Sequence, residues 1–184
     1  MWAVPYPSIL EMTGGSYLVP LRIEVVVTLE PSPTVEAVVE EEDTYLVLSA
    51  DPEVREPGIA RLRAFHEAYA AEPATPGSIV VREGSPIRLL AVIHDLSQDP
   101  TWREEWVAAA LEAALVEADS RKVRTLAMPP LGRVHGSLPR ERFVVLLRSA
   151  LGAASSRHLE DVRLVVPGEE VNAFRDLFES GLWR

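Results

Sequence analysis

One loop of this chain has the residue types and spacing that favour anion binding. Residues 128–139 read Met-Pro-Pro-Leu-Gly-Arg-Val-His-Gly-Ser-Leu-Pro, and they lie between an apolar strand pattern and a helical pattern. A glycine-containing connection of this kind presents backbone N–H groups and the positive end of a helix dipole to an anion. It also lies at the carboxyl ends of the strands, where open α/β sheets bind ligands. The alternative is that Gly132 and Gly136 only permit a tight connection.

Sequence motifs of the familiar enzyme classes are absent. The chain has no P-loop, no Gly-x-Gly-x-x-Gly, no Gly-x-Ser-x-Gly and no His-Glu-x-x-His. The lack of cysteine excludes disulfides, thiolate nucleophiles and cysteine metal clusters. The histidines lie far apart, without metal-ligand spacing: His66, His94, His135 and His158. We therefore expect no metal site and no cofactor.

The elements that must position this loop belong to one domain. The chain has 184 residues, 47% hydrophobic and 25% charged, which is typical of a globular domain that needs no disulfide to hold its core. We predict a single domain over residues 1–184. Residues 1–17 contain Trp2 and Tyr6 among prolines and glycines, and we expect an irregular arm that packs on the domain or on a second subunit.

Strand and helix patterns alternate along the chain, which is typical of an α/β protein with a largely parallel sheet. Thr101 and Glu104 form a capping-box pattern that predicts a helix over 101–117. Gly152 is the expected C-terminal cap of a helix that opens at residues 137–139. Further helices are predicted over 59–71 and 169–178, and strands over 21–29, 45–48, 79–81, 87–93, 125–128 and 162–166.

An acidic stretch interrupts this alternation. Residues 36–43 contain Glu36, Glu40, Glu41, Glu42 and Asp43. Charge runs usually form solvated surface, so we expect an exposed connection or a short exposed helix there.

Net charge and composition limit the partners. A net charge of −10 repels phosphate backbones and anionic lipid surfaces, so broad nucleic-acid or membrane binding is not expected. The N-terminus lacks the pattern of a signal peptide, and no apolar run is long enough to span a membrane, so we expect a cytoplasmic protein. Lys122, Gln98 and Asn172 are the only residues of their types, a composition that either heat adaptation or a GC-rich genome produces.

Three stretches resemble the macrodomain family, the ADP-ribose-binding α/β modules. They are residues 76–94 with the strand that ends in Val-Ile-His, the helix and strand of residues 101–128, and the loop of residues 128–139. The similarity covers about residues 44–182. It implies a three-layer α/β/α sandwich with a mixed, largely parallel sheet, whose first long strand pairs at an edge or antiparallel to the rest.

The same resemblance places the ligand cleft. Macrodomains usually carry Val-Asn-Ala-Ala-Asn after the second strand, and the matching stretch here is Val47–Asp51, so that an aspartate replaces the last asparagine. The family's Ser-x-Gly-hydrophobic-aromatic-Gly loop corresponds to residues 131–136. The resemblance implies these ligand-binding residues: Ser49, Ala50, Asp51, Leu131, Gly132, Arg133, Val134, His135 and Gly136.

Arg133 replaces a glycine of the family's pyrophosphate loop, and two consequences stay open. Its guanidinium either supplies a bidentate phosphate contact or fills the cleft, and Asp51 would be an internal partner that favours filling. Arg133→Gly should strengthen ADP-ribose binding if the side chain fills the cleft.

Three functions are compatible with these observations. We expect a module that binds ADP-ribose, a related nucleotide or another phosphorylated small molecule without turnover. The alternatives are an ADP-ribosyl hydrolase with Asp51 or His135 as proton-transfer groups, and a structural or homo-oligomerising module that has lost the pocket.

Overall fold

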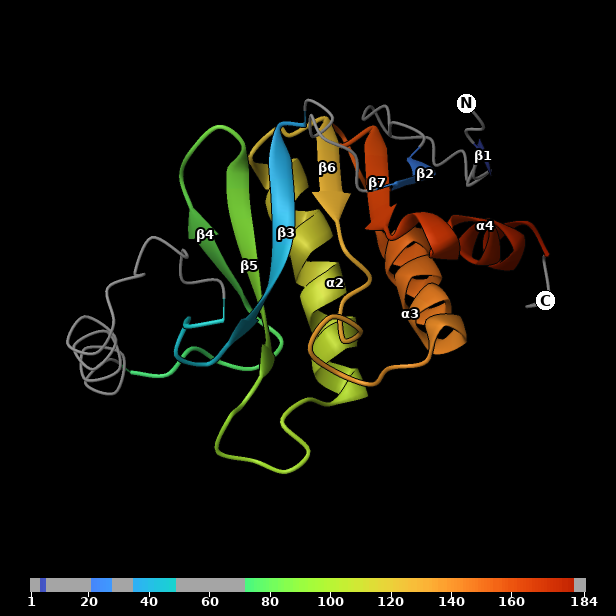
Figure 1. Ribbon diagram of the computed structural model, residues 1–184. Coiled ribbons are helices and arrows are strands. Elements are labelled where there is room, and N and C mark those ends of the chain that lie inside the picture. The colour runs from blue at the N-terminus through green and yellow to red at the C-terminus, as the bar shows by residue number, and fades with distance from the viewer. Residues whose placement is uncertain (1–3, 6–20, 28–34, 49–71, 181–184) are drawn as a thin grey trace.

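The computed structural model describes residues 4–5, 21–27, 35–48 and 72–180 (Figure 1). Its first five described elements are strands, and strands and helices alternate from the fifth strand onward. The strands are β1 (Val4–Pro5), β2 (Arg22–Val27), β3 (Ala37–Asp43), β4 (Ile79–Arg82), β5 (Ile87–His94), β6 (Thr125–Met128) and β7 (Asp161–Val166). The helices are α2 (Glu104–Ser120), α3 (Arg140–Ala153), the short η1 (Gly168–Glu170) and α4 (Val171–Glu179).

All strands join one mixed sheet in the order β1-β2-β7-β6-β3-β5-β4. The inner pairs β2–β7, β7–β6, β6–β3 and β3–β5 are parallel, whereas β1 and β4 pair antiparallel at the two edges. The parallel pairs bring the carboxyl ends of β3, β5, β6 and β7 to the same end of the sheet, the lower one in Figure 1, which we call its carboxyl edge. This confirms the predicted α/β class with a mixed, largely parallel sheet.

Two predictions about the N-terminal part were wrong. Strand β2 lies next to the edge and pairs parallel with β7, neither at the edge nor antiparallel to the rest. Val4–Pro5, in the arm predicted to be irregular, forms the edge strand β1. The rest of that arm and the predicted helix over 59–71 lie outside the described residues.

The acidic stretch is not an exposed connection but β3, an inner strand of the sheet. Its burial pattern alternates in the first half, with Ala37 and Val39 buried, and then becomes continuous through Glu41, Glu42 and Asp43. The predicted strand over 45–48 is a turn that follows β3. Charge counted along the sequence therefore gave the wrong environment for an inner strand of the sheet.

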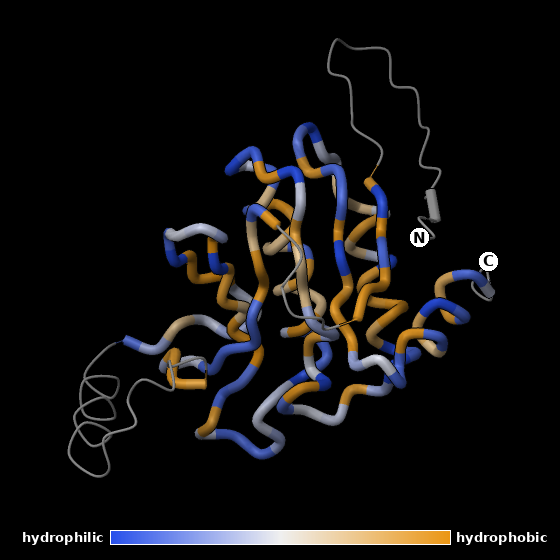
Figure 2. The backbone as a smooth tube through the Cα atoms, turned by 45° about the horizontal axis from the view of Figure 1, so that its top comes forward, coloured by the Kyte–Doolittle hydropathy of each residue, from blue (hydrophilic) through white to orange (hydrophobic). Residues whose placement is uncertain are grey.

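Helices α2 and α3 pack against each other and against the sheet, and their apolar faces form the core with the inner faces of the strands. Apolar stretches run along parts of the strands, polar residues such as the acidic second half of β3 interrupt them, and apolar and polar residues alternate along the helices (Figure 2). Fully buried Phe143 of α3 and Phe174 of α4 meet edge to face, with ring centroids 6.2 Å apart. None of the described helices has the length and apolarity that a membrane span requires.

The predicted helix boundaries move by a few residues. Helix α2 begins at Glu104 and not at Thr101, because Trp102 forms a β-bridge with His94 and keeps this segment extended. Gly152 lies inside α3, whose C-terminal cap is Ala154.

Candidate functional site

The predicted anion loop leaves β6 at the carboxyl edge of the sheet and returns into α3. Gly132 has a φ of 78°, a conformation that side chains rarely adopt. A Cβ built on Gly136 would lie 2.4 Å from the Gly132 carbonyl oxygen, so this position requires glycine for close backbone approach. The loop is closed by the Leu138 N–H, which donates to the same carbonyl over 3.0 Å. Both glycines are therefore structural requirements of this loop.

The inward-facing amides of the loop converge on one carboxylate, that of Glu41 in β3. The N–H of Gly132 donates to Glu41 Oε1 over 2.5 Å, and the N–H of Val134 lies 3.4 Å from the same oxygen. The N–H of His135 donates to Glu41 Oε2 over 3.1 Å. The loop thus holds an oxyanion, and the oxyanion is a side chain of the protein itself.

A histidine completes the surroundings of this carboxylate. His94, at the end of β5, places its Nε2 3.3 Å from Glu41 Oε2, and both side chains are only 2% exposed. Its Nδ1 lies 3.5 Å from the Thr101 hydroxyl, and its ring meets that of His135 edge-on at 6.1 Å. The segment before α2 is therefore tied to the same buried group as the loop before α3.

The next two acids of β3 hold the turn that follows the strand. The Asp43 carboxylate accepts hydrogen bonds from the N–H groups of Tyr45, Val47 and Leu48 over 2.6–3.0 Å. Glu42 Oε1 accepts the Leu48 N–H over 2.6 Å. Consecutive acids at the end of β3 thus hold both the loop before α3 and the turn after β3.

Backbone amides make the burial of these acids possible. A buried carboxylate is costly unless hydrogen bonds or a cation compensate its charge, and amide donors to a carboxylate form strong, charge-assisted bonds. Glu42 and Asp43 are fully buried, and Glu41 is 6% exposed when its backbone is counted with its side chain. We infer that this acidic strand end is part of the architecture and not a solvated charge run.

The Arg133 side chain extends to the segment after β7. Its Nη2 donates to both carboxylate oxygens of Glu170 over 3.0 and 3.2 Å, and its Nη1 donates to the Leu138 carbonyl over 3.2 Å. The guanidinium carbon lies 5.8 Å from the centre of the Phe174 ring. The internal partner in the described part of the chain is thus Glu170, whereas the sequence suggested Asp51.

The structure places the predicted site residues in two groups. Residues 131–136 lie together in the loop, where Leu131 is buried while Val134 and His135 are exposed. Ser49, Ala50 and Asp51 lie outside the described residues. The sequence analysis missed Glu41, Glu42 and Asp43, although the alternating Ala37 and Val39 before them are a signal of a buried strand.

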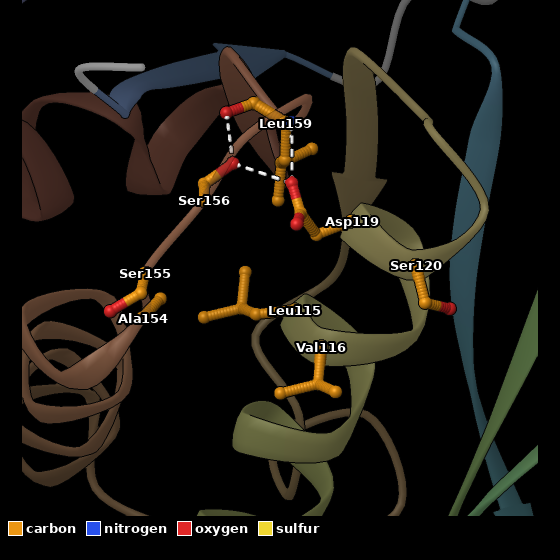
Figure 3. Close-up of a pocket in the computed structure, with 8 residues that line it drawn as sticks. All are labelled: Leu115, Val116, Asp119, Ser120, Ala154, Ser155, Ser156 and Leu159. Atoms are coloured by element: carbon orange, nitrogen blue, oxygen red, sulfur yellow. Dashed lines mark hydrogen bonds between the residues drawn. The ribbon is translucent and has the colours of Figure 1, made fainter. Parts of the chain in front are cut away.

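A small cavity of about 210 Å³ lies at the opposite end of the sheet (Figure 3). It is formed between the last turn of α2 and the connection that leads into the amino end of β7. Asp119 Oδ1 accepts the Ser156 hydroxyl and the backbone N–H groups of residues 157–159. Burial raises the pKa of this carboxyl, but those hydrogen bonds outweigh burial and lower the pKa to about 2. Nucleotide-sized ligands need larger pockets, so we assign Asp119 a structural role.

Metal binding gains no support from the described ranges. Within them, no group of three or more histidine, aspartate and glutamate side chains is arranged to hold a metal ion.

Comparison with known proteins relates the chain to macrodomains through structure. No protein-family model and no curated protein matches the sequence. A macrodomain of Oceanobacillus iheyensis solved with ADPR superposes with a TM-score of 0.67 at 14% identity, over 97% of this chain and 98% of that chain. The macrodomain of Thermus aquaticus DarG gives 0.54 at 24% identity, over 79% and 98% of the two chains. A Trypanosoma brucei macrodomain superposes with a TM-score of 0.58 at 11% identity, over 84% of this chain and 66% of that chain. The chain has the macrodomain fold.

Proposed function

We propose that this protein is a divergent macrodomain-like module that binds ADP-ribose, a related nucleotide or another phosphorylated small molecule. The loop of residues 131–136, at the carboxyl edge of the sheet, is the described part of the proposed site, whereas Ser49, Ala50 and Asp51 are assigned to it by the family resemblance alone. The observation that carries the proposal is the convergence of the loop amides on a carboxylate. A loop that already surrounds one oxyanion has the geometry that a ligand phosphate needs.

Two structural comparisons support the class of ligand. The Oceanobacillus iheyensis macrodomain was solved with ADPR, and also with ADP at a TM-score of 0.67 and 12% identity. Ligands of open α/β sheets bind outside the carboxyl ends of the strands, where the loop of residues 131–136 lies. Binding without turnover is proposed because the Asn residues of the family motif have no counterparts in this chain.

A second candidate function follows from the same contacts together with the Arg133–Glu170 pair. Glu41 occupies the inward-facing amides, and Glu170 engages Arg133. Both contacts favour a structural or oligomerising module that keeps the fold without the pocket.

A thermal-shift series separates the two functions. The full chain is heated with ADP-ribose, ADP, AMP, NAD or inorganic phosphate, and saturation at about 100 times Kd should stabilise the native state by about 2.7 kcal/mol. Binding predicts that at least one nucleotide raises Tm. The pocketless module predicts no shift with any of them.

A further inference from the structure

We infer that the Glu41 carboxylate is an internal occupant of a small oxyanion site, and that an external phosphate or carboxylate must compete with it for the amides of residues 132–135. This inference deepens the proposed function and rests on it, because the same loop would hold the ligand phosphate. It adds a residue that sets the affinity and selectivity of the site.

The first step of the argument is the inventory of donors. The N–H groups of Gly132, Val134 and His135 all face one carboxylate within 3.4 Å. His94 Nε2 faces it from the other side at 3.3 Å. Donors from one loop and one strand therefore surround one side-chain group that is itself 2% exposed. This arrangement is a built oxyanion site.

The second step concerns charge. A ligand phosphate that approached these amides would meet the Glu41 carboxylate in the same space, and two like charges at contact distance repel strongly. Phosphate can gain the amides only if Glu41 gives them up. With Glu41 in place, we expect the loop to hold phosphate weakly and to select ligands by their other parts.

The third step identifies what would restore the site. Glu41→Ala removes the side-chain methylene and carboxylate beyond Cβ, and acetate carries the same heavy atoms. The variant leaves its amide donors and His94 without an acceptor, a costly state for buried polar groups. Acetate, formate or phosphate should therefore enter the vacated site and stabilise the variant.

Glu40 provides a matched control on the same strand. Its side chain pairs with Arg88 over 2.5–3.1 Å and is about one third exposed. Successive residues of a strand point to opposite faces of the sheet, so Glu40 and Glu41 point to opposite faces. Glu40→Ala removes the same atoms and the same charge as Glu41→Ala. It creates no amide-lined site, so acetate and phosphate should affect it as they affect the wild type.

The decisive experiment measures Tm of the full chain for wild type, Glu40→Ala and Glu41→Ala in sodium acetate, formate, phosphate and chloride at equal ionic strength. We expect acetate or phosphate at about 100 times Kd to raise the Tm of Glu41→Ala by about 5–10 °C relative to chloride, with little change in the other two proteins. A Glu41→Ala protein that folds only when an oxyanion is added supports the inference equally. A folded Glu41→Ala protein that no oxyanion stabilises overturns it.

A second variant covers the case in which Glu41→Ala does not fold in any salt. Glu41→Gln keeps the shape of the side chain and removes its charge, and inorganic phosphate should bind it about tenfold or more tightly than the wild type. Titration followed by the amide resonances of Gly132, Val134 and His135 measures both affinities at the loop. Equal phosphate affinity of Glu41→Gln and wild type overturns the competition.

Measurement of ADP-ribose binding by the same proteins distinguishes a failure of this inference from a failure of the proposed function. If Glu41→Gln binds phosphate more tightly while no variant binds a nucleotide, the internal-anion inference stands and the proposed function fails. If the wild type binds ADP-ribose and Glu41→Gln gains nothing for phosphate, the proposed function stands and the inference fails.

Discussion

Arg133 and Glu170 form an ion pair that joins the candidate loop to the segment after β7. Nη2 of the arginine lies 3.0 and 3.2 Å from the two carboxylate oxygens, and the side chains are only 21% and 27% exposed. Because the pair is partly shielded and Arg133 also packs over Phe174, we expect it to stabilise the fold more than an exposed surface pair does. The pair anchors the outer side of the loop while Glu41 anchors its inner side.

Removal of this anchor should lower stability. Arg133→Ala should reduce the free energy of unfolding by about 1–2 kcal/mol, through the lost hydrogen bonds and the lost contact with Phe174. A double-mutant cycle with Glu170→Ala, measured by urea unfolding, should give a coupling of about 1 kcal/mol. Arg124→Ala is the control, because its pair with Glu36 is exposed and 3.7 Å long, and we expect a loss below about 0.5 kcal/mol. A coupling near zero would show that the Arg133–Glu170 pair does not anchor the loop.

Arg133 should contribute little to ligand affinity, because Glu170 and the Leu138 carbonyl already engage its guanidinium. Calorimetric titration of Arg133→Ala with ADP-ribose should change Kd by less than about tenfold, or 1.4 kcal/mol. A larger loss would reveal a direct phosphate contact. Tighter binding by Arg133→Gly would show instead that the side chain obstructs the cleft.

The depressed pKa of Asp119 makes a defined part of stability depend on acid pH. A carboxyl whose folded-state pKa lies near 2, below its ordinary 3.8, stabilises the fold above pH 4, and this stability is lost as pH falls towards 2. We expect the wild type to lose about 1–2 kcal/mol from this group over that interval, after allowance for solvent screening. Asp119→Asn should lose correspondingly less between pH 4 and pH 2.

Glu112→Gln is the control for Asp119→Asn. It removes the same charge from an exposed position on the same helix, and its acid profile should follow that of the wild type. Urea unfolding at several pH values supplies the comparison. Identical acid profiles for Asp119→Asn and wild type would contradict the assignment.

Two glycines form a matched pair for a test of loop geometry. Gly136→Ala places a Cβ 2.4 Å from the Gly132 carbonyl oxygen, a backbone atom that cannot move aside cheaply, so we expect a loss of about 2–3 kcal/mol. Gly152→Ala meets no heavy atom within 4 Å and lies in α3, so it should gain up to about 1 kcal/mol. Thermal unfolding of both variants gives the two signs. A neutral Gly136→Ala would mean that the loop does not require this close approach.

Hydrolysis is the remaining alternative to binding. We expect no time-dependent release of ADP-ribose from an ADP-ribosylated protein above a boiled control, because the Asn residues of the family motif are absent. Release that falls in Asp51→Ala or His135→Ala would support the hydrolase instead.

The sequence by itself determined the elements whose cause is local. Apolar runs identified β5, β6 and β7, and continuous apolarity is what strands such as β5 and β6, which are buried along most of their length, require. Helical periodicity identified α2, α3 and α4, and the glycine and proline pattern identified the loop of residues 131–136 between a strand and a helix. Boundaries were less accurate, since the β-bridge between Trp102 and His94 delays the start of α2 beyond its apparent cap.

Only the tertiary structure decided the nature of the acidic strand and the contacts of the candidate site. The loop amides that donate to Glu41 lie 91 to 94 positions further along the chain. The residues that neighbour Glu41 in the sequence therefore do not reveal why its charged group can be buried. Arg133 likewise finds Glu170 through the fold and not through sequence proximity. Buried charge is stable only where distant donors converge on it, and that convergence is a property of the packed chain.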